Sequence, residues 1–154
     1  MARHYVERAR SLAAASALLC FCSWPAVGAD DAATAAELAH LRGAWTVTAA
    51  EQGGKPFDAI NGGVLTIDGT SFALRTASGN ELAGTIAIDP GAVPKQLDFL
   101  HSTGKIWEAI YTVAGEVLRL NYVERGDAPR PTVFATTADT PSTVIVLRKA
   151  ASTP

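Results

Sequence analysis

The sequence predicts an all-β domain of eight antiparallel strands preceded by one short helix. Short runs of alternating apolar and polar residues recur along the chain from about residue 45 onward. Turn-forming pairs such as Asp68-Gly69 separate these runs, and no helical pattern interrupts them. Neighbouring strands joined by tight turns run antiparallel, so the architecture is either a sandwich or an up-and-down barrel.

The expected elements follow one another along the chain. A helix is expected over residues 32–41, where strong helix formers surround Leu38 and Leu41, three residues apart. Strands are expected over residues 45–48, 64–67, 71–75, 82–88, 96–100, 105–113, 117–123 and 144–147. Between the strands expected over residues 117–123 and 144–147, a polar stretch that contains Gly126, Pro129 and Pro131 leads to residues 132–134.

Residues 1–29 are predicted to form a cleavable secretory signal, which leaves residues 30–154 as one domain. The first ten residues contain three arginines against one glutamate, as a positive signal start requires. The uncharged run from Leu12 to Trp24 has 13 residues, fewer than the roughly 20 that span a bilayer as a helix. Small residues at 26–29 favour cleavage after Ala29. We therefore expect a secreted or periplasmic protein with no transmembrane segment after cleavage.

Both cysteines of the chain lie inside this predicted signal. Cys20 or Cys22 could carry a lipid anchor, but a bulky Leu19 or Phe21 precedes each where lipoprotein signals need a small residue. After cleavage the domain has no disulfide and no cysteine ligand for a metal. It then carries ten basic against 14 acidic residues, a formal net charge of −4. This balance argues against nucleic acid or anionic lipid as a partner.

The segment Leu41-Arg42-Gly43-Ala44-Trp45 resembles the Gly-x-Trp opening of lipocalin-like barrels. In those barrels the tryptophan of the first strand plugs one end, and an arginine of the last strand lies across its face. Arg148 stands at the corresponding place, and such a cation–π contact contributes about 1 kcal/mol. The resemblance implies an eight-stranded lipocalin-like barrel that Gly43, Trp45 and Arg148 close.

More specifically, the chain resembles an uncharacterised, largely secreted family of bacterial lipocalin-like (calycin) domains that is noted for its expansion in planctomycetes. The matching pieces span about residues 41 to 149: Leu41-x-Gly43-x-Trp45, Gly54-Lys55-Pro56, Asp89-Pro90 with Pro94-Lys95 and Asp98, Ile110-Tyr111 before Gly115 and Leu118, Arg130-Pro131 with Phe134, and Val146-Leu147-Arg148. Members often carry a cysteine where this chain has Asn121, so any role of that thiol is absent. The family has no established activity, so the resemblance implies a fold and not a function.

Residues suited to catalysis are few. His40 and His101 are the only histidines of residues 30–154, and neither has the spacing of a metal motif, so no metal or cofactor is expected. An enzyme would require Asp98, Glu108, Tyr111 or His101 to converge in one pocket. No catalytic motif is present, and the sequence predicts no enzyme.

Arg130, which precedes a proline in the polar crossover, has two interpretations. Its guanidinium could bind an anionic group of a ligand. Alternatively, it pairs with a nearby carboxylate such as Glu124 or Asp127, and this structural role is favoured.

The interior of an eight-stranded barrel is either filled by its own side chains or holds one small ligand. Taking the face of Trp45 as the interior, large apolar residues occupy most of the inward positions. The expected inward residues, besides two from residues 106–111, are Trp45, Val47, Leu65, Ile67, Phe72, Leu74, Ile86, Ile88, Leu97, Phe99, Leu118, Leu120, Tyr122, Val144 and Val146. Any cavity should therefore be modest and apolar, at the end opposite Trp45.

Two functions fit this pattern. The first is binding of a small hydrophobic ligand in the barrel, with Phe99, Trp107, Tyr111 and Tyr122 as the candidate ligand-binding residues. The alternative is a non-catalytic interaction or structural module of the cell envelope, in which Trp107 and residues 124–131 contact another protein. A Trp107 exposed beside other apolar side chains would favour this module, whereas a Trp107 buried in the barrel would remove its main support.

Overall fold

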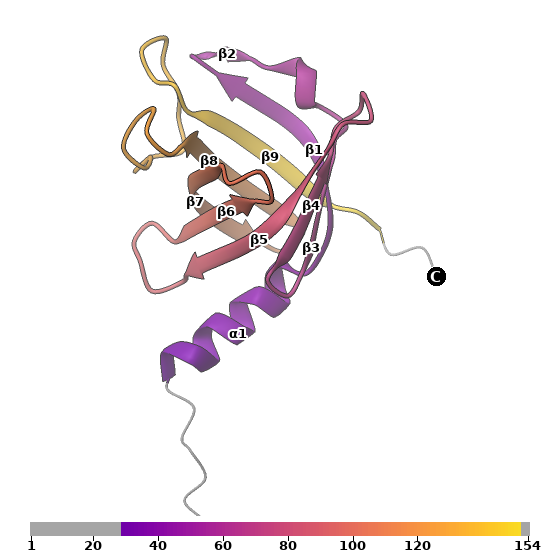
Figure 1. Ribbon diagram of the computed structural model, residues 1–154, viewed down its shortest axis with the longest axis vertical. Coiled ribbons are helices and arrows are strands. Elements are labelled where there is room, and N and C mark those ends of the chain that lie inside the picture. The colour runs from indigo at the N-terminus through magenta and orange to yellow at the C-terminus, as the bar shows by residue number, and fades with distance from the viewer. Residues whose placement is uncertain (1–28, 152–154) are drawn as a thin grey trace, which may run out of the picture.

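The computed structural model describes residues 29–151, which form a closed barrel of eight antiparallel strands preceded by one helix (Figure 1). The helix α1 spans Ala29–Leu41. A two-residue strand β2 (Lys55–Pro56) and a 3-10 turn η1 (Asp58–Ile60) lie outside the barrel wall. The barrel strands are β1 (Gly43–Gln52), β3 (Val64–Asp68), β4 (Ser71–Arg75), β5 (Glu81–Asp89), β6 (Gln96–His101), β7 (Ile106–Ala114), β8 (Val117–Glu124) and β9 (Thr143–Lys149).

The predicted fold class, an up-and-down lipocalin-like barrel with a short N-terminal helix, is confirmed. From β3 to β9 each strand pairs with the next in sequence, and β1 pairs with both β3 and β9. This closure leaves no barrel strand with an unpaired edge. Apart from Ala29, the first residue of α1, the predicted signal segment lies outside the described residues.

The helix α1 closes one end of the barrel by packing its last turn against Trp45. Leu41 and Trp45 are both 0% exposed, and the Trp45 indole Nε1 donates a hydrogen bond to the Leu41 carbonyl oxygen at 2.7 Å. Gly43 joins the two with φ +128°, a backbone conformation that residues with a Cβ rarely adopt. An ion pair of 2.6 Å between Glu37 and Lys95 fastens the helix to the loop before β6.

The cation at this closed end is Lys149, so the prediction that Arg148 covers Trp45 was wrong. The Lys149 Nζ lies 5.1 Å from the centroid of the Trp45 ring. Trp45 pairs with Lys149 across β1 and β9, whereas Arg148 pairs with Thr46 and is exposed. Because side chains alternate along a strand, neighbouring residues point to opposite faces.

The same shift of one residue corrects the predicted interior of β9. Ile145 and Leu147 belong to the barrel core, and Val144 and Val146 do not. Hydrophobicity could not show this, because the four residues from 144 to 147 are all apolar. Choosing Arg148 as the partner of Trp45 therefore placed the wrong face of the whole strand inside.

Residues 125–142, here called the strap, contain no strand and cross the outside of the barrel between β8 and β9. The Asn121 Nδ2 on β8 donates hydrogen bonds to the carbonyl oxygens of Val133 (2.7 Å) and Ala135 (3.3 Å). Arg119, two residues earlier, donates to the carbonyl oxygen of Phe134 at 2.8 Å. Asn121 itself is 1% exposed although it points away from the barrel core. The strap thus explains why both faces of these strands carry buried residues.

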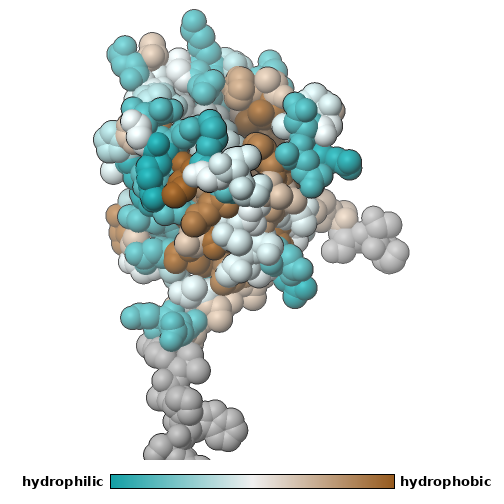
Figure 2. All heavy atoms as spheres, viewed as in Figure 1, coloured by the Kyte–Doolittle hydropathy of each residue, from teal (hydrophilic) through white to brown (hydrophobic). Residues whose placement is uncertain are grey.

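Apolar side chains are not confined to the interior of the barrel. In the view of Figure 1, apolar side chains form a band across the centre and hydrophilic side chains surround it (Figure 2). Among the described residues, the exposed large hydrophobic side chains are Val93 (97%), Leu100 (39%) and Val133 (62%). These three lie on separate elements, namely the β5–β6 turn, β6 and the strap.

Candidate functional site

At the end of the barrel opposite α1, the interior holds a largely enclosed apolar cavity of about 80 Å³. Strand β3 shows its position: Leu65, near the start of the strand, lines the cavity. Asp68, at the other end, pairs with Arg42 just after α1 at 3.0 Å. The cavity has the modest size, apolar lining and location that the sequence predicts.

Most of the cavity wall is aliphatic or aromatic. Among the described residues that line it, the polar side-chain groups are the phenol of Tyr122, the hydroxyl of Thr76 and the indole N–H of Trp107. Ile60 reaches the cavity from η1, outside the barrel wall. The aliphatic lining residues are Val47, Ile60, Leu65, Leu74, Leu82 and Ile145, and the aromatic ones are Phe72, Phe99, Trp107 and Tyr122.

The aromatic lining residues hold one another in place. Trp107 stacks on Tyr122, with ring centroids 4.8 Å apart and planes at 22°. Phe99 meets the edge of Phe72 at 5.0 Å and that of Trp107 at 6.3 Å. Such stacked and edge-to-face pairs contribute about 1 kcal/mol each beyond the area they bury. The aromatic side of the cavity is therefore a fixed wall from four different strands.

The phenol of Tyr122 is held in its neutral form. Burial raises its pKa above the ordinary value, and the hydrogen bond with Thr143 offsets this only in part. The Gln52 Nε2 donates to the Thr143 Oγ1 at 3.2 Å, which fixes the hydroxyl beside Tyr122. Because the other lining residues do not ionise, the wall carries no charge near neutral pH. A group that enters the cavity must itself be uncharged, since an unpaired buried charge is strongly disfavoured.

Of the four predicted ligand-binding residues, the structure brings Phe99, Trp107 and Tyr122 together around the cavity. Tyr111 lies elsewhere in the core, with Lys95 Nζ 5.9 Å from its ring centroid. Burial raises the pKa of Tyr111 strongly, and the negative charge of Glu37 on α1 adds to the effect. Its phenol therefore belongs to the contact between helix and barrel.

Some lining residues escaped the sequence-based prediction. Ile60 is carried by a 3-10 turn, and Thr76 follows β4, so strand alternation has no bearing on either. Ile145 escaped because of the shifted face of β9. His101, which the sequence suggested only for catalysis or metal binding, does not line the cavity, but its ring centroid lies 4.1 Å from that of Trp107.

The polar residues that an enzyme would require are separated by the barrel wall. Asp98 and Glu108 pair directly across β6 and β7 and lie on the outside, whereas Tyr111 belongs to the barrel core. His101 also turns inward, between Phe72 and Trp107. These side chains do not converge on one pocket, so the structure gives no support to the catalytic hypothesis that they motivated.

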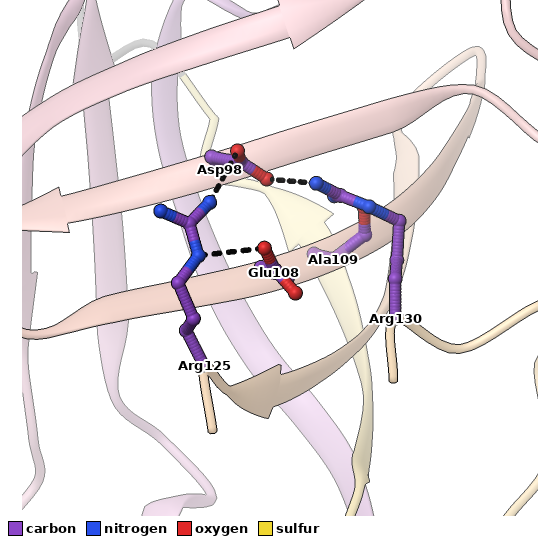
Figure 3. Close-up of polar contacts among 5 residues, drawn as sticks. All are labelled: Asp98, Glu108, Ala109, Arg125 and Arg130. Carbon is purple, nitrogen blue, oxygen red and sulfur yellow. Dashed lines mark hydrogen bonds and ion pairs between the residues drawn. The ribbon is translucent and has the colours of Figure 1, made fainter. Parts of the chain in front are cut away.

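Asp98 and Glu108 instead hold the first part of the strap through two arginines (Figure 3). The Arg130 guanidinium meets Asp98 Oδ1 at 2.6 Å and donates to the Ala109 carbonyl oxygen at 2.8 Å. The Arg125 Nε donates to Glu108 Oε1 at 2.7 Å, and its Nη2 lies 3.6 Å from Asp98 Oδ2. Two acidic and two basic groups balance, so the network can fasten the strap without attracting an ion.

The favoured interpretation of Arg130 was right in kind but wrong in its partner. Arg130 pairs with Asp98, and not with Glu124 or Asp127. Glu124 is held by Lys105 at 2.9 Å. The Arg130 guanidinium is thus committed to the barrel and does not serve as a free site for an anionic ligand.

The position of Trp107 bears on both predicted functions. It is half-buried, lines the cavity and stacks on Tyr122 inside the barrel. An interaction module would have needed Trp107 beside other apolar side chains on the outer surface. In the other proposed contact region, residues 124–131, Arg125 and Arg130 turn toward the barrel. The interaction alternative has therefore lost its main support.

The fold and the site together define a small β-barrel with an apolar cavity at its end remote from α1. Within residues 29–151, no group of three His, Cys, Asp or Glu side chains is arranged to hold a metal ion. No helix in this range is long and apolar enough to cross a membrane. Comparisons with protein family models, with curated proteins and with solved structures found no match.

Proposed function

We propose that this protein is an exported lipocalin-like domain that binds a small hydrophobic molecule by taking one of its apolar groups into the barrel. The observation that carries this proposal is the cavity of about 80 Å³, bounded by aliphatic and stacked aromatic side chains. Apolar pockets with few polar groups are typical of small-molecule sites. The resemblance of Gly43-x-Trp45 to the opening of lipocalin-like barrels concerns the fold that encloses this cavity.

The size of the cavity favours a slender ligand. An apolar cavity of about 150 Å³ is known to hold a benzene ring. By proportion, a cavity of about 80 Å³ accommodates roughly three or four carbon atoms. The end of a straight alkyl or acyl chain fits this space, whereas a six-membered ring does not. The rest of the ligand then extends out of the barrel end, where a polar head remains in water.

The length of the ligand's alkyl chain should control its affinity for the cavity. Each methylene group removed from water contributes about 0.8 kcal/mol. This value corresponds to about a fourfold gain in affinity per carbon. Straight-chain alcohols should therefore bind more tightly with each added carbon until the cavity is filled, after which the gain per carbon becomes smaller. Cyclohexanol should bind more weakly than hexan-1-ol.

The test compares alcohol binding by the wild type with binding by a variant whose cavity is filled. We would titrate butan-1-ol, hexan-1-ol and octan-1-ol and follow the NMR signal of the Trp107 indole. Val47→Phe places a larger side chain in the cavity and should weaken binding at least tenfold. Val93→Phe makes the same substitution at a fully exposed site and should bind as the wild type does. Undiminished binding by Val47→Phe, or no binding to the wild type, would contradict the proposal.

The proposed export has an independent test. Residues 1–29 have the charge, length and small terminal residues of a secretory signal. Sequencing the N-terminus of the protein recovered from a bacterial periplasm or culture medium should give Asp30 as the first residue. A protein that keeps Met1 or stays inside the cell would rule out this signal, and a lipid on Cys20 or Cys22 would support the lipoprotein alternative.

A further inference from the structure

His101, the last residue of β6, lies in an apolar environment beside the cavity wall. The residue is 7% exposed, and its ring centroid is 4.1 Å from that of Trp107 and 5.3 Å from that of Phe72. Its Nε2 is buried and has no hydrogen-bond partner among the described residues. A buried nitrogen without a partner destabilises the folded state, because buried polar atoms normally form hydrogen bonds.

Protonation of the His101 imidazole is unfavourable at this position. An imidazolium carries an N–H on both nitrogens, so the buried Nε2 becomes a charged donor that lacks an acceptor. Burial accordingly lowers the pKa of His101 below its ordinary value. At neutral pH the ring is uncharged and can pack against Trp107 as an aromatic side chain.

The charged groups around His101 do not compensate for an added proton. The carboxylate of Glu124, at the end of β8, attracts an imidazolium, and the ammonium of Lys105, in the β6–β7 turn, repels it. These two groups pair with each other at 2.9 Å, so their fields at the imidazole oppose each other. Tyr122, on the far side of the contact with Trp107, is neutral because burial raises its pKa.

We propose that His101 makes ligand binding by the cavity dependent on pH, with the neutral ring holding Trp107 in its binding position. This inference rests on the proposed function. The protonated ring finds hydrogen-bond partners only in water, beside the exposed residues 102–105 of the adjoining turn. When it moves there, Trp107 loses the contact at 4.1 Å and keeps only its contacts with Tyr122 and Phe99. The cavity wall that Trp107 forms is then less well defined.

The direction of the effect follows from linkage. The ligand binds the form with a neutral His101, so protonation competes with binding. The affinity is therefore constant at high pH and falls as the pH drops below the pKa of His101 in the ligand-free protein. For one linked proton, the fall approaches about tenfold per pH unit.

Octan-1-ol is a suitable probe because it stays uncharged at every pH used. Its dissociation constant would be measured at pH 7.5, 6.5, 5.5 and 5.0 by the Trp107 indole signal, with circular dichroism to check that the barrel stays folded. The wild type should bind more weakly at pH 5.0 than at pH 7.5, with a loss that approaches about tenfold per pH unit below the pKa of His101. His101→Phe keeps an aromatic ring without a titrating group, and His101→Gln keeps a neutral polar side chain, so the affinity of each variant should be almost the same at every pH. His40→Gln removes an exposed histidine of α1 and should behave as the wild type.

Three outcomes would overturn the inference. Binding by the wild type that does not change with pH refutes the role of His101 and leaves the proposed function intact. An equal loss of affinity at low pH in His101→Phe and in the wild type assigns the effect to another group. If octan-1-ol and the shorter alcohols bind at no pH, the proposed function fails, and its regulation fails with it.

Discussion

The two ends of the barrel are each built around a tryptophan, but they use it differently. At the closed end, Trp45 is 0% exposed, its indole nitrogen donates to Leu41, and Lys149 covers its ring. At the end remote from α1, here called the open end, Trp107 is half-buried and lines the cavity. It also contacts His101, whose Nε2 has no hydrogen-bond partner among the described residues. At the closed end, both the indole nitrogen and the ring face of the tryptophan have a partner. At the open end, a cavity and a histidine nitrogen without a hydrogen-bond partner lie beside the tryptophan.

This difference separates the end of the barrel that stabilises the fold from the end where we propose that a ligand binds. A fully packed interior side chain contributes in proportion to the contacts it makes, and Trp45 is 0% exposed. The open end contains a cavity of about 80 Å³ and is therefore less tightly packed, as the proposed binding site requires. We therefore expect substitutions at the closed end to change folding, and those at the open end to change binding more than folding.

The largest expected effect is a difference between the two tryptophans. Trp45→Ala removes a fully buried ring and leaves a large cavity, which should lower the free energy of unfolding by about 3 to 5 kcal/mol. Trp107→Ala removes a half-buried ring beside an existing cavity and should cost less than half as much. Urea unfolding followed by circular dichroism measures both values. Equal losses in the two variants would mean that the open end is as important for stability as the closed end.

A second prediction concerns the response of the open end to acid. Because burial lowers the pKa of His101 in the folded protein, the unfolded chain binds a proton more readily, with an ordinary pKa of about 6.5. The contribution of the neutral ring to stability is therefore complete above about pH 6.5 and decreases as the pH falls further. One proton limits the slope to about 1.4 kcal/mol per pH unit.

The measurement compares the wild type with His101→Phe, because carboxylates elsewhere also respond to acid. Urea unfolding at pH 7.5, 6.5 and 5.5 should show the wild type losing more stability than the variant below pH 6.5. His40→Gln should follow the wild type, since His40 is exposed on α1. Parallel losses in the wild type and His101→Phe would contradict a buried, neutral His101.

The barrel could be predicted because its determinants are local. Alternating residues define each strand, and pairs such as Asp68-Gly69 and Ala114-Gly115 place the turns between neighbours. The closing helix was also predictable from its composition, since residues 32–41 are strong helix formers. The two-residue strand β2 was not predicted, because Lys55 and Pro56 are too short a run for alternation to show.

The inward faces were harder to predict where a strand is apolar on both sides. On β9 the strap covers the outside, so Val144 is 6% exposed although it is not part of the barrel core. On β7, Ile110 and Tyr111 are both buried on successive positions, only one of which belongs to that core. A sequence records that a residue is apolar, but not whether the barrel core or a later segment of the chain covers it.

The candidate site was predictable only as far as it lies on regular strands. Phe99 and Trp107 on adjacent strands, and Tyr122 on the next, share one face by register. The contribution of Ile60 depends on how the segment between β1 and β3 folds over the barrel end, which no periodic pattern specifies. The importance of His101 depends on its missing partner, a property of the packed structure alone.

The smallest expected effect tests the corrected face of β9 at the closed end. Lys149→Ala removes the cation 5.1 Å from the Trp45 ring centroid, which should cost about 1 kcal/mol of unfolding free energy. Arg148→Ala changes an exposed side chain on the opposite face and should stay within about 0.5 kcal/mol of the wild type. Because both variants remove one positive charge from adjacent residues, their difference reports the contact with Trp45 and not the net charge. A larger loss for Arg148→Ala would restore the original assignment and place Val144 and Val146 inside the barrel.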